Sequence, residues 1–506
     1  MKKILTKLLS RMGLTIFVIF LQILWCIIML LRVSAYAPWI NALFSVIGLV
    51  FVIYIINRDT NPSYKIAWLI PIFIFPIFGV LIYLLFGNKK YAKVLRKKFK
   101  NTDEIITENL KQDEKVLSEM EERDATCAQY LKKCGYPVYD NTETTYFPSG
   151  ESMWPQIISE ISKAEHFIFL EYFIIGEGKV WNSILDILVK KAKEGVDVRV
   201  IYDDVGCLSK IPTGYTKKLN SMGIKALAFN PFIPLISAVM NNRDHRKILV
   251  VDGHTAFTGG INLADEYMNI IYPYGYWKDT GIMLHGKAVW NLTYMFLQMW
   301  NVIHSTKEDF EIYHPEKHHM EEFSGTGFTQ PFSDSPLDDE SISQNVYIDI
   351  ISRATKYVYI STPYLVIDDE MKNALTFAAK RGVDVRIITP GIPDKKIVYR
   401  LTRSNYPPLL AAGVKIYEFE EGFVHAKSIV SDDRIAVVGT INLDFRSLYL
   451  HFECGVLMVE TPSVAEVRDD NLETFKKSRE ITTENRKRNI FERIFDTILR
   501  TLAPLL

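Results

Sequence analysis

The chain has 506 residues, enough for two or three domains. Its 59 lysines and arginines balance 59 aspartates and glutamates, so net charge gives no indication of a polyanionic partner such as nucleic acid. The five cysteines are scattered, odd in number and without a C-x-x-C pair. This pattern argues against a disulfide framework or a zinc site built from cysteines, and it fits a reducing compartment.

Three apolar runs fill the first 86 residues: Leu14 to Leu31, Ala37 to Ile56, and Ile66 to Phe86. Each is close to the length that crosses a hydrocarbon core of about 30 Å. Residues 1–100 are therefore predicted to form an N-terminal membrane segment of two or three hydrophobic helices with a basic flank. The first run resembles a signal peptide, but its length and Pro38 favour an uncleaved helix.

The charges around these runs leave the topology open. The basic flank is a strong positive-inside signal, yet three full spans would place the basic N-terminus on the opposite side. One run is therefore a candidate for an interfacial segment, either the first or the third, which Pro71 and Pro76 interrupt. We expect the catalytic part to be cytoplasmic. The flank consists of Lys89, Lys90, Lys93, Arg96, Lys97, Lys98 and Lys100.

Two long segments, 136–323 and 340–484, resemble each other. Ala192 to Arg199 is nearly repeated as Ala379 to Arg386. Each segment has the pattern helix, buried strand, helix, glycine, buried strand and, later, a hairpin. That order predicts α/β domains, each with a mixed, largely parallel sheet covered by helices.

Three further segments complete the predicted organisation. Residues 101–135 are charged with a helical pattern and are predicted to form a stalk. Residues 324–339, rich in Ser, Gly, Pro and Asp, are predicted to be a linker between the repeats. Residues 485–506 form a basic amphipathic helix, whose apolar face either docks on the parent domain or lies in a membrane interface. That face comprises Ile490, Phe491, Ile494, Phe495, Ile498, Leu499 and Leu502.

One motif occurs twice, 180 residues apart, in a strand–turn–strand context. Side chains alternate across a strand, so the histidine and the lysine of each copy point to one face. A lone histidine at a strand end is usually structural, but a second copy in register makes coincidence a poor explanation. The motif residues are His245, Lys247, Asp252, Gly259 and Asn262, and again His425, Lys427, Asp432, Gly439 and Asn442.

These residue types suit the transfer of a phosphodiester. The two motif lysines can neutralise the phosphoryl oxygens, and the two asparagines can donate hydrogen bonds to them. With an unperturbed pKa near 6.5, two histidines can hold opposite protonation states, one as nucleophile and the other as acid. The pattern predicts a two-step reaction through a phosphohistidine, with no cofactor and no metal.

The two motif aspartates have two interpretations. Asp252 precedes a glycine, the strongest short hairpin signal, and Asp432 precedes a second aspartate. Turn formation and a direct catalytic role are about equally supported, so both aspartates stand as candidate catalytic residues.

Two copies of H-x-K-x4-D make this chain resemble the phospholipase D superfamily, and its whole length resembles bacterial cardiolipin synthases. The resemblance covers both motif regions, the membrane segment Asn61-Pro62-Ser63-Tyr64-Lys65-Ile66-Ala67-Trp68 and the terminal Pro504-Leu505-Leu506. It implies two duplicated phospholipase D-like α/β domains that face each other, preceded by an N-terminal transmembrane segment. Both motifs would then meet at one interfacial site.

The resemblance also implies that a carboxylate downstream of each motif orients the histidine of that motif. The matching positions are Asp279 and Glu453. A carboxylate that accepts from one ring nitrogen fixes the tautomer of the other, although a structural salt bridge is the alternative for each residue. His451 stands where many relatives carry Asn.

The resemblance implies a phosphatidyltransferase of a bacterial cell membrane, multi-pass, with phosphatidylglycerol as substrate and cardiolipin as product. Superfamily precedent favours His245 as nucleophile and His425 as acid, although the motifs are nearly symmetrical. The expected partners are these lipids and the lipid bilayer, not nucleic acid, and the oligomer state is left open.

Two rival interpretations remain at this stage. A phospholipase D-type hydrolase would give the intermediate to water, and a non-enzymatic scaffold would bind anionic lipid without turnover.

Overall fold

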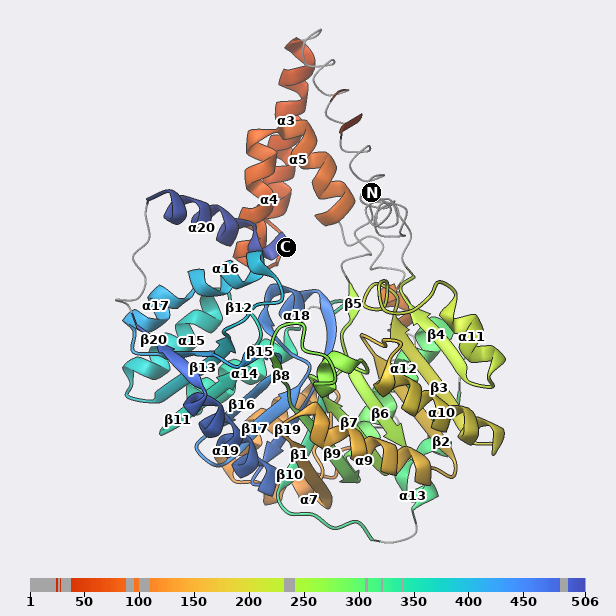
Figure 1. The fold of residues 1–506 in the computed structure, drawn as a ribbon. Helices are drawn as coiled ribbons and strands as arrows, with labels where there is room; N and C mark the ends of the chain where they lie inside the picture. Colours follow the sequence, from red (N-terminus) through yellow and green to blue (C-terminus); the bar gives the residue numbers. More distant parts are fainter. Residues whose placement is uncertain are drawn as a thin grey trace. The chain divides into compact units, whose positions relative to one another are not determined.

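A computed structural model of the chain describes residues 24–25, 28, 38–87, 95–99, 110–231, 242–304, 308–319, 322–338, 340–482 and 490–505. The first apolar run, most of the basic flank and residues 101–109 of the predicted stalk lie largely or wholly outside these residues. The chain divides into two compact units, which are described separately (Figure 1). One comprises residues 1–94, 230–242 and 489–506, and the other comprises residues 95–229 and 243–488.

The smaller unit is helical. Its interior is formed by apolar side chains of the first helices, among them Trp68 and Tyr83, whose rings pack edge to face at 5.4 Å. Leu505, near the chain end, packs against this cluster. The elements are α3 (Pro38–Ile56), α4 (Pro62–Ile74), α5 (Pro76–Ile82), the π-helix η1 (Tyr83–Gly87), α20 (Ile490–Leu502) and the 3-10 helix η5 (Ala503–Leu505).

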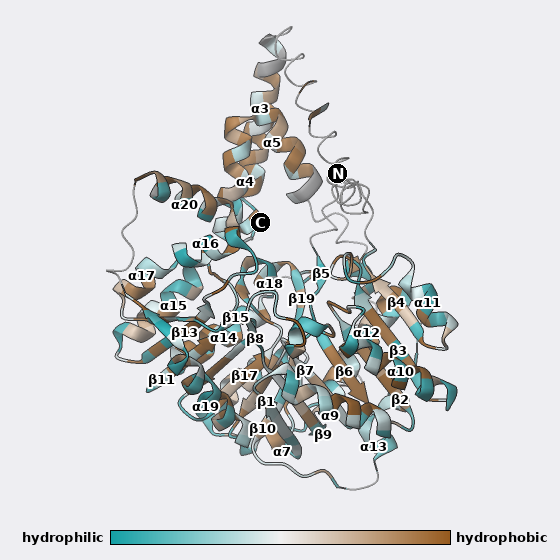
Figure 2. Ribbon diagram, viewed as in Figure 1, coloured by the Kyte–Doolittle hydropathy of each residue, from teal (hydrophilic) through white to brown (hydrophobic). Residues whose placement is uncertain are grey.

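The third apolar run is not one continuous helix. α4 ends at Ile74, and α5 begins at Pro76. Phe75 between them is extended, because a proline disfavours helical geometry in the residue before it. Among the described residues, no helix combines the length and the apolar content needed to cross a membrane. Many apolar side chains of α3 and α4 are nevertheless exposed. The ribbons of both helices are coloured largely hydrophobic in Figure 2.

Within the smaller unit, the C-terminal helix α20 packs through the side opposite its apolar stripe. It lies against α4 and η5, and Asp496 is buried. Phe491 is 78% exposed, and Ile490, Ile494, Phe495 and Ile498 are exposed as well. The apolar stripe therefore faces away from the rest of the smaller unit.

The larger unit contains both repeats. In the first repeat, the strands of the sheet and the helices around it are β1 (Thr142–Phe147), α9 (Gly150–Lys163), β2 (Phe167–Tyr172), α10 (Lys179–Lys193), β3 (Asp197–Asp203), α11 (Tyr215–Ser221), β4 (Lys225–Phe229), β6 (Lys247–Val251), β7 (Thr255–Gly259), β9 (Gly281–Gly286) and α12 (Val289–His304). The short elements β5 (Arg243–Asp244), η3 (Asp265–Met268), β8 (Tyr276–Lys278), η4 (Phe310–Tyr313) and α13 (Pro315–His318) accompany them.

The second repeat has the same order of elements. Those of its sheet and the surrounding helices are β10 (Phe328–Asp334), α14 (Ile342–Arg353), β11 (Tyr357–Ser361), α15 (Asp369–Lys380), β13 (Asp384–Pro390), α16 (Lys396–Ser404), α17 (Tyr406–Ala411), β14 (Lys415–Phe419), β16 (Ser428–Ser431), β17 (Ile435–Gly439), β19 (His451–Val459), α19 (Pro462–Lys476) and β20 (Ser478–Ile481). The short elements are β12 (Leu365–Val366), β15 (Gly422–Val424), β18 (Leu443–Asp444) and α18 (Phe445–Tyr449).

Each repeat builds one mixed sheet, and the two motif segments are hairpins as predicted. The first sheet has the order β1-β9-β7-β6-β2-β3-β4, and the main path of the second is β10-β19-β17-β16-β11-β13-β14-β20. In each main path only two neighbouring pairs are parallel, β2–β3–β4 and β11–β13–β14. The expectation of largely parallel sheets is therefore wrong, because the motif hairpin and the strand after it add antiparallel pairs at one side.

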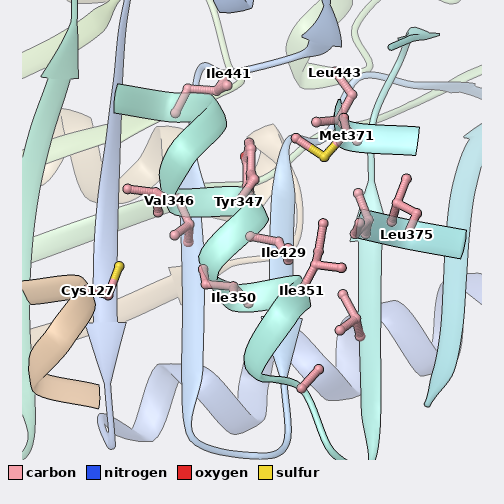
Figure 3. Close-up of a cluster of buried hydrophobic side chains, with 14 of the residues drawn as sticks. Cys127, Val346, Tyr347, Ile350, Ile351, Met371, Leu375, Ile429, Ile441 and Leu443 are labelled. Atoms are coloured by element: carbon pink, nitrogen blue, oxygen red, sulfur yellow. The ribbon is translucent and has the colours of Figure 1, made fainter. Parts of the chain in front are cut away.

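Helices cover both faces of each sheet. In the first repeat α9, α10 and α11 contribute to one hydrophobic core, while α12 packs against the other face, where Phe296 stacks on Phe169. In the second repeat α14 and α15 fill the corresponding core; Figure 3 shows Val346, Ile350 and Leu375 turned toward Ile429 of the motif strand. The β7 and β17 strands of the two sheets contact each other, so the repeats meet along their motif hairpins.

Two predicted segments differ in the structure. The described part of the stalk forms α7 (Glu114–Glu119) and α8 (Glu122–Lys133), whose buried side chains, including Cys127, belong to the core of the second repeat (Figure 3). The predicted linker contains β10, which pairs along its length with β19. Polar and turn-forming residues around Phe328 to Phe332 concealed this strand in the sequence.

Candidate active site

Two very short parallel ladders cross between the repeats and create the site. β5 of the first repeat, directly before His245, pairs with the start of β19 in the second repeat. β15 of the second repeat, directly before His425, pairs with β8 of the first. Each histidine thus directly follows a strand that pairs with a strand of the opposite repeat.

The crossing places each histidine beside the carboxylate of the other repeat. His245 donates its backbone N–H to the Phe452 carbonyl at 2.9 Å, and its Nδ1 lies 2.9 Å from both carboxylate oxygens of Glu453. His425 Nδ1 lies 2.6 Å from Asp279 Oδ2. Asp279 and Glu453 thus each contact a motif histidine, but the expected pairing of each carboxylate with the histidine of its own motif is wrong. Since each carboxylate accepts from Nδ1, Nε2 is left for chemistry.

The two motif lysines are buried beside the histidines. Lys247 Nζ donates to the His245 carbonyl at 2.7 Å, and Lys427 Nζ makes the same bond to the His425 carbonyl. Burial lowers the pKa of Lys247 to about 8 and that of Lys427 to about 7, against the opposing pull of nearby carboxylates. The nearby carboxylates therefore do not fully offset the cost of burying these two ammonium groups, and a bound anion would stabilise their charge.

Both histidines are held neutral in the unliganded site. Burial lowers the pKa of His245 well below its usual value, and Lys247 adds to the effect. Burial and Lys427 lower the pKa of His425 to about 4. The opposite protonation states do not, therefore, come from unperturbed histidines. A bound phosphodiester supplies the negative charge that favours an imidazolium.

The pKa values of the two carboxylates shift in opposite directions, although both side chains are fully buried. Burial raises the pKa of Glu453 to about 8, although it accepts hydrogen bonds from the hydroxyls of Thr440 and Ser447. Burial also acts to raise the pKa of Asp279, but His425 and Lys427 outweigh it and the pKa is lowered. Asp279 is thus the more fully ionised of the two.

The motif asparagines are buried at the same site but differ in their contacts. Asn262 Oδ1 accepts from the Ile174 backbone at 2.9 Å. Asn442 Oδ1 has no hydrogen-bond partner within the described residues. An amide that is buried and incompletely bonded is available to a ligand.

His451 is a site residue to which the sequence analysis gave no role. Its ring lies 5.7 Å from that of His245, and neither ring nitrogen has a hydrogen-bond partner in the described parts of the chain. Its position two residues before Glu453, on the same face of the same strand, was the signal that could have identified it.

The motif aspartates lie at the far end of the hairpins. Asp252 accepts from the backbone N–H groups of residues 165–167, and Asp432 accepts from those of residues 355–357. Both adopt positive φ, at 49° and 55°. These contacts correct the candidate catalytic role: each aspartate clasps the turn of its hairpin to the start of the neighbouring strand.

Three groups of side chains in the described residues bring potential metal-ligand atoms within 4.8 Å of one another. One includes His245 and its carboxylate, which are already bonded to each other. Another surrounds Arg434, which fills its centre with a guanidinium. The groups are His245, His451 and Glu453; Glu121, Asp124 and Glu460; and His254, His285 and His319.

A duplicated α/β fold with two histidine–lysine pairs at the junction of the repeats defines a phosphodiester-transfer site of the phospholipase D kind. The family profile described as "Cardiolipin synthase, PLD-like domain" matches residues 157–300 and 347–474, one match per repeat. A second profile, described as "Phospholipase_D-nuclease N-terminal", matches residues 43–88. The chain belongs to the cardiolipin synthase family with phospholipase D-like domains.

Relatives match over nearly the whole chain. A protein of Geobacillus sp. called cardiolipin synthase is 36% identical, covering 91% of this chain and 92% of its own length. Cardiolipin synthase 2 of Bacillus cereus is 35% identical, covering 90% and 89%. An uncharacterised protein of Streptococcus mutans is 48% identical, covering 90% and 99%.

Among solved structures, phosphatidylserine synthase of Haemophilus influenzae has a similar fold. The TM-score is 0.57 at 15% sequence identity, over 76% of this chain and all of that one. At this identity the likeness establishes the fold of the two repeats.

We predict that Asp432→Ala lowers stability and spares chemistry. The substitution removes the acceptor of three backbone donors, of which the Tyr357 N–H is buried, so the free energy of unfolding should fall by about 1–3 kcal/mol. Hydrogen bonds to Asp432 hold its pKa below the usual range against the effect of burial. Its stabilising contribution is therefore present above about pH 4 and is lost as the pH falls further.

Denaturant unfolding at several pH values measures this effect. Asp433→Ala, the adjacent and more exposed carboxylate, is the matched control and should cost less. If folded Asp432→Ala protein loses its turnover, the aspartate is catalytic after all.

The crossed pairing can be tested directly on the histidine rings. In protein labelled with ¹⁵N-histidine, Glu453→Gln should move the Nδ1 resonance of His245, and Asp279→Asn that of His425, because each substitution removes the acceptor of that Nδ1–H. Signals are assigned with single histidine variants. If each substitution perturbs the histidine of its own repeat instead, the crossed arrangement is wrong.

Proposed function

We propose that this protein is a membrane-bound phosphatidyltransferase that makes cardiolipin from two molecules of phosphatidylglycerol and releases glycerol. The observation that carries the proposal is the crossed pairing, because it brings two carboxylate-oriented histidines, each with its own buried lysine, to one site. Family membership and relatives called cardiolipin synthase support the choice of lipid.

In the first step one histidine Nε2 attacks the phosphorus of phosphatidylglycerol. The bond from phosphorus to the glycerol oxygen breaks, and the other histidine, as imidazolium, protonates that oxygen. The product is a phosphatidyl-histidine and free glycerol. The two lysines balance the charge on the phosphoryl oxygens, and the two asparagines hydrogen-bond to them.

In the second step the histidine that gave its proton is neutral and acts as base. It takes the proton of a hydroxyl on a second phosphatidylglycerol, whose oxygen attacks the phosphorus. The phosphorus–nitrogen bond breaks, cardiolipin leaves, and both histidines return to their starting states. Protons therefore balance over the cycle, with no group outside the chain and the two lipids.

The difference between the carboxylates supports His245 as the nucleophile and His425 as the acid. The more fully ionised Asp279 stabilises a positive charge on His425, whereas Glu453, with its raised pKa, stabilises one on His245 less. The same assignment follows from superfamily precedent.

Product analysis on the purified chain with phosphatidylglycerol tests this function. Wild-type protein should give cardiolipin and glycerol in equal amounts. His245→Ala and His425→Ala should each lower turnover by at least about a thousandfold, because the two histidines act as one unit. Arg246→Lys, at a buried ion pair beside the nucleophile, controls for damage to packing.

Other products would decide between the rival functions. Phosphatidic acid as the main product would make the protein a hydrolase. Binding of anionic vesicles without turnover of any phospholipid would leave a scaffold.

We further propose that the smaller unit holds the enzyme at a bacterial cell membrane, as a multi-pass segment with the two repeats on the cytoplasmic side. Support comes from the exposed apolar side chains of α3 and α4, the outward stripe of α20 and the match of residues 43–88 to an N-terminal family segment. A helix with one exposed apolar face suits the interface plane.

The membrane contact of α20 predicts protection from trypsin. Cleavage after Arg500 should be slower in anionic vesicles than in detergent, because the stripe is inserted between lipids. The double substitution Phe491→Asp and Ile498→Asp should abolish the protection by placing charges in the stripe. Thr497→Asp adds a charge outside it and should preserve the protection; equal cleavage of all variants in both media would contradict the contact.

A further inference from the structure

Three histidines from separate segments converge at the outer end of the first motif hairpin. His254 lies in the turn between β6 and β7, His285 on β9, and His319 directly after α13. Each offers one ring nitrogen, and the three nitrogens lie within 4.8 Å of one another. All three side chains are half-buried. The five residues of β6 separate this cluster from the catalytic His245, about 16 Å along the strand.

A buried hydroxyl orients two of these rings. Thr255 Oγ1 lies 3.0 Å from Nδ1 of His254 and 3.0 Å from Nδ1 of His285, which is its cross-strand neighbour. One hydroxyl oxygen can accept from both Nδ1–H groups. That arrangement leaves Nε2 of both rings unprotonated, the state in which imidazole binds a metal.

The third ring is held by stacking. The ring of His319 lies parallel to that of Phe323 at 4.4 Å, and 5.1 Å from the ring of His254. The cluster therefore joins the hairpin turn and β9 to the chain that leaves the first repeat.

The equivalent hairpin turn of the second repeat is attached to a neighbouring segment by ion pairs. Its hairpin turn carries Arg434 where the first repeat carries His254, two residues after the motif aspartate. Arg434 makes ion pairs with Glu121, Asp124 and Glu460, and it thereby fastens α8 to the turn. One turn is thus tied to a neighbouring segment by a cation among carboxylates. The other turn has a histidine at the position of the arginine, and two further histidines lie beside it.

We propose that His254, His285 and His319 bind a zinc ion that fastens the segment after α13 to the first motif hairpin. Imidazole nitrogen is a preferred zinc ligand, and three histidines leave a fourth tetrahedral position for water. Zinc–nitrogen bonds of about 2.0–2.1 Å require the rings to close by about an ångström, which half-buried side chains accomplish by rotating. The ion is structural and remote from the phosphoryl-transfer site.

Zinc titration of the full-length, metal-stripped protein against a fluorescent chelator tests the proposal. Wild-type protein should bind one ion per chain. His319→Ala and, as a second variant, His285→Gln should each weaken the affinity about a hundredfold, since a ligand is lost. His318→Ala is the matched control: its Nε2 lies 2.7 Å from the Ile312 carbonyl, its ring packs on His166, and zinc affinity should be unchanged.

Cobalt substitution distinguishes the ligands. Bound Co²⁺ should show a tetrahedral spectrum without thiolate charge transfer, because the cluster contains no cysteine. The proposal is overturned by wild-type affinity weaker than about 10 μM, by thiolate bands, or by equal affinity in His318→Ala and His319→Ala. Any of these results would leave the three rings as aromatic packing around Phe323.

Discussion

The active site depends on an exchange of backbone between the repeats. Two parallel ladders, of two and three residue pairs, fix the position of each histidine along a strand of the opposite repeat. Phe452 accepts the N–H of His245 and directly precedes Glu453; Lys278 accepts the N–H of His425 and directly precedes Asp279. The same hydrogen bonds that seat each histidine therefore deliver its carboxylate. Neither repeat contains a complete histidine–carboxylate pair by itself.

Burial gives this arrangement its charge state. A site that holds two lysines, two histidines and two carboxylates away from water favours their neutral forms. The pKa values of both histidines and both lysines are therefore lowered, so the imidazoles are neutral and the lysines bind their protons less tightly. In the free protein each lysine bonds to the carbonyl of its own histidine, two residues away. An arriving phosphodiester supplies the missing negative charge and a better partner. In the proposed mechanism, substrate binding and protonation of the acid are therefore coupled.

The sequence predicted what depends on local pattern. The repeated spacing identified the histidines, lysines and asparagines, and the β-rich run and turn residues after each motif lysine indicated the motif hairpins. It did not reveal the crossed pairing, because a period of two residues defines the face of a strand and not its neighbour. The linker prediction failed at β10 for a related reason: a strand at the border of a sheet can be short and polar, and its assignment rests on β19, more than a hundred residues away.

The sequence left the role of Asp252 and Asp432 undecided, because an aspartate at this motif position suits both a structural role in the hairpin turn and a role in catalysis. The distinction lies in the partners: both carboxylates are occupied by backbone donors at the end of the hairpin opposite the histidines. The four residues between the lysine and the aspartate of each motif therefore form the strand that links the histidine end of the hairpin to the aspartate that binds its turn.

The two repeats also differ around the carboxylates that contact the histidines, where identical surroundings would give both histidines the same properties. A transfer reaction with a covalent intermediate needs one nucleophile and one acid, but a symmetrical site offers two of each. A Cβ on Gly260 would lie 2.0 Å from Asp279 Oδ1, so this position cannot carry the threonine found at the equivalent Thr440. Asp279 consequently lacks the hydroxyl donor that Glu453 receives from Thr440, and that hydroxyl by itself lowers the pKa of Glu453. The lowered pKa of Asp279 comes from His425 and Lys427, which outweigh burial there, whereas burial prevails at Glu453. The two carboxylates are therefore unequal in charge state, and in the proposed mechanism this inequality gives the histidines different roles.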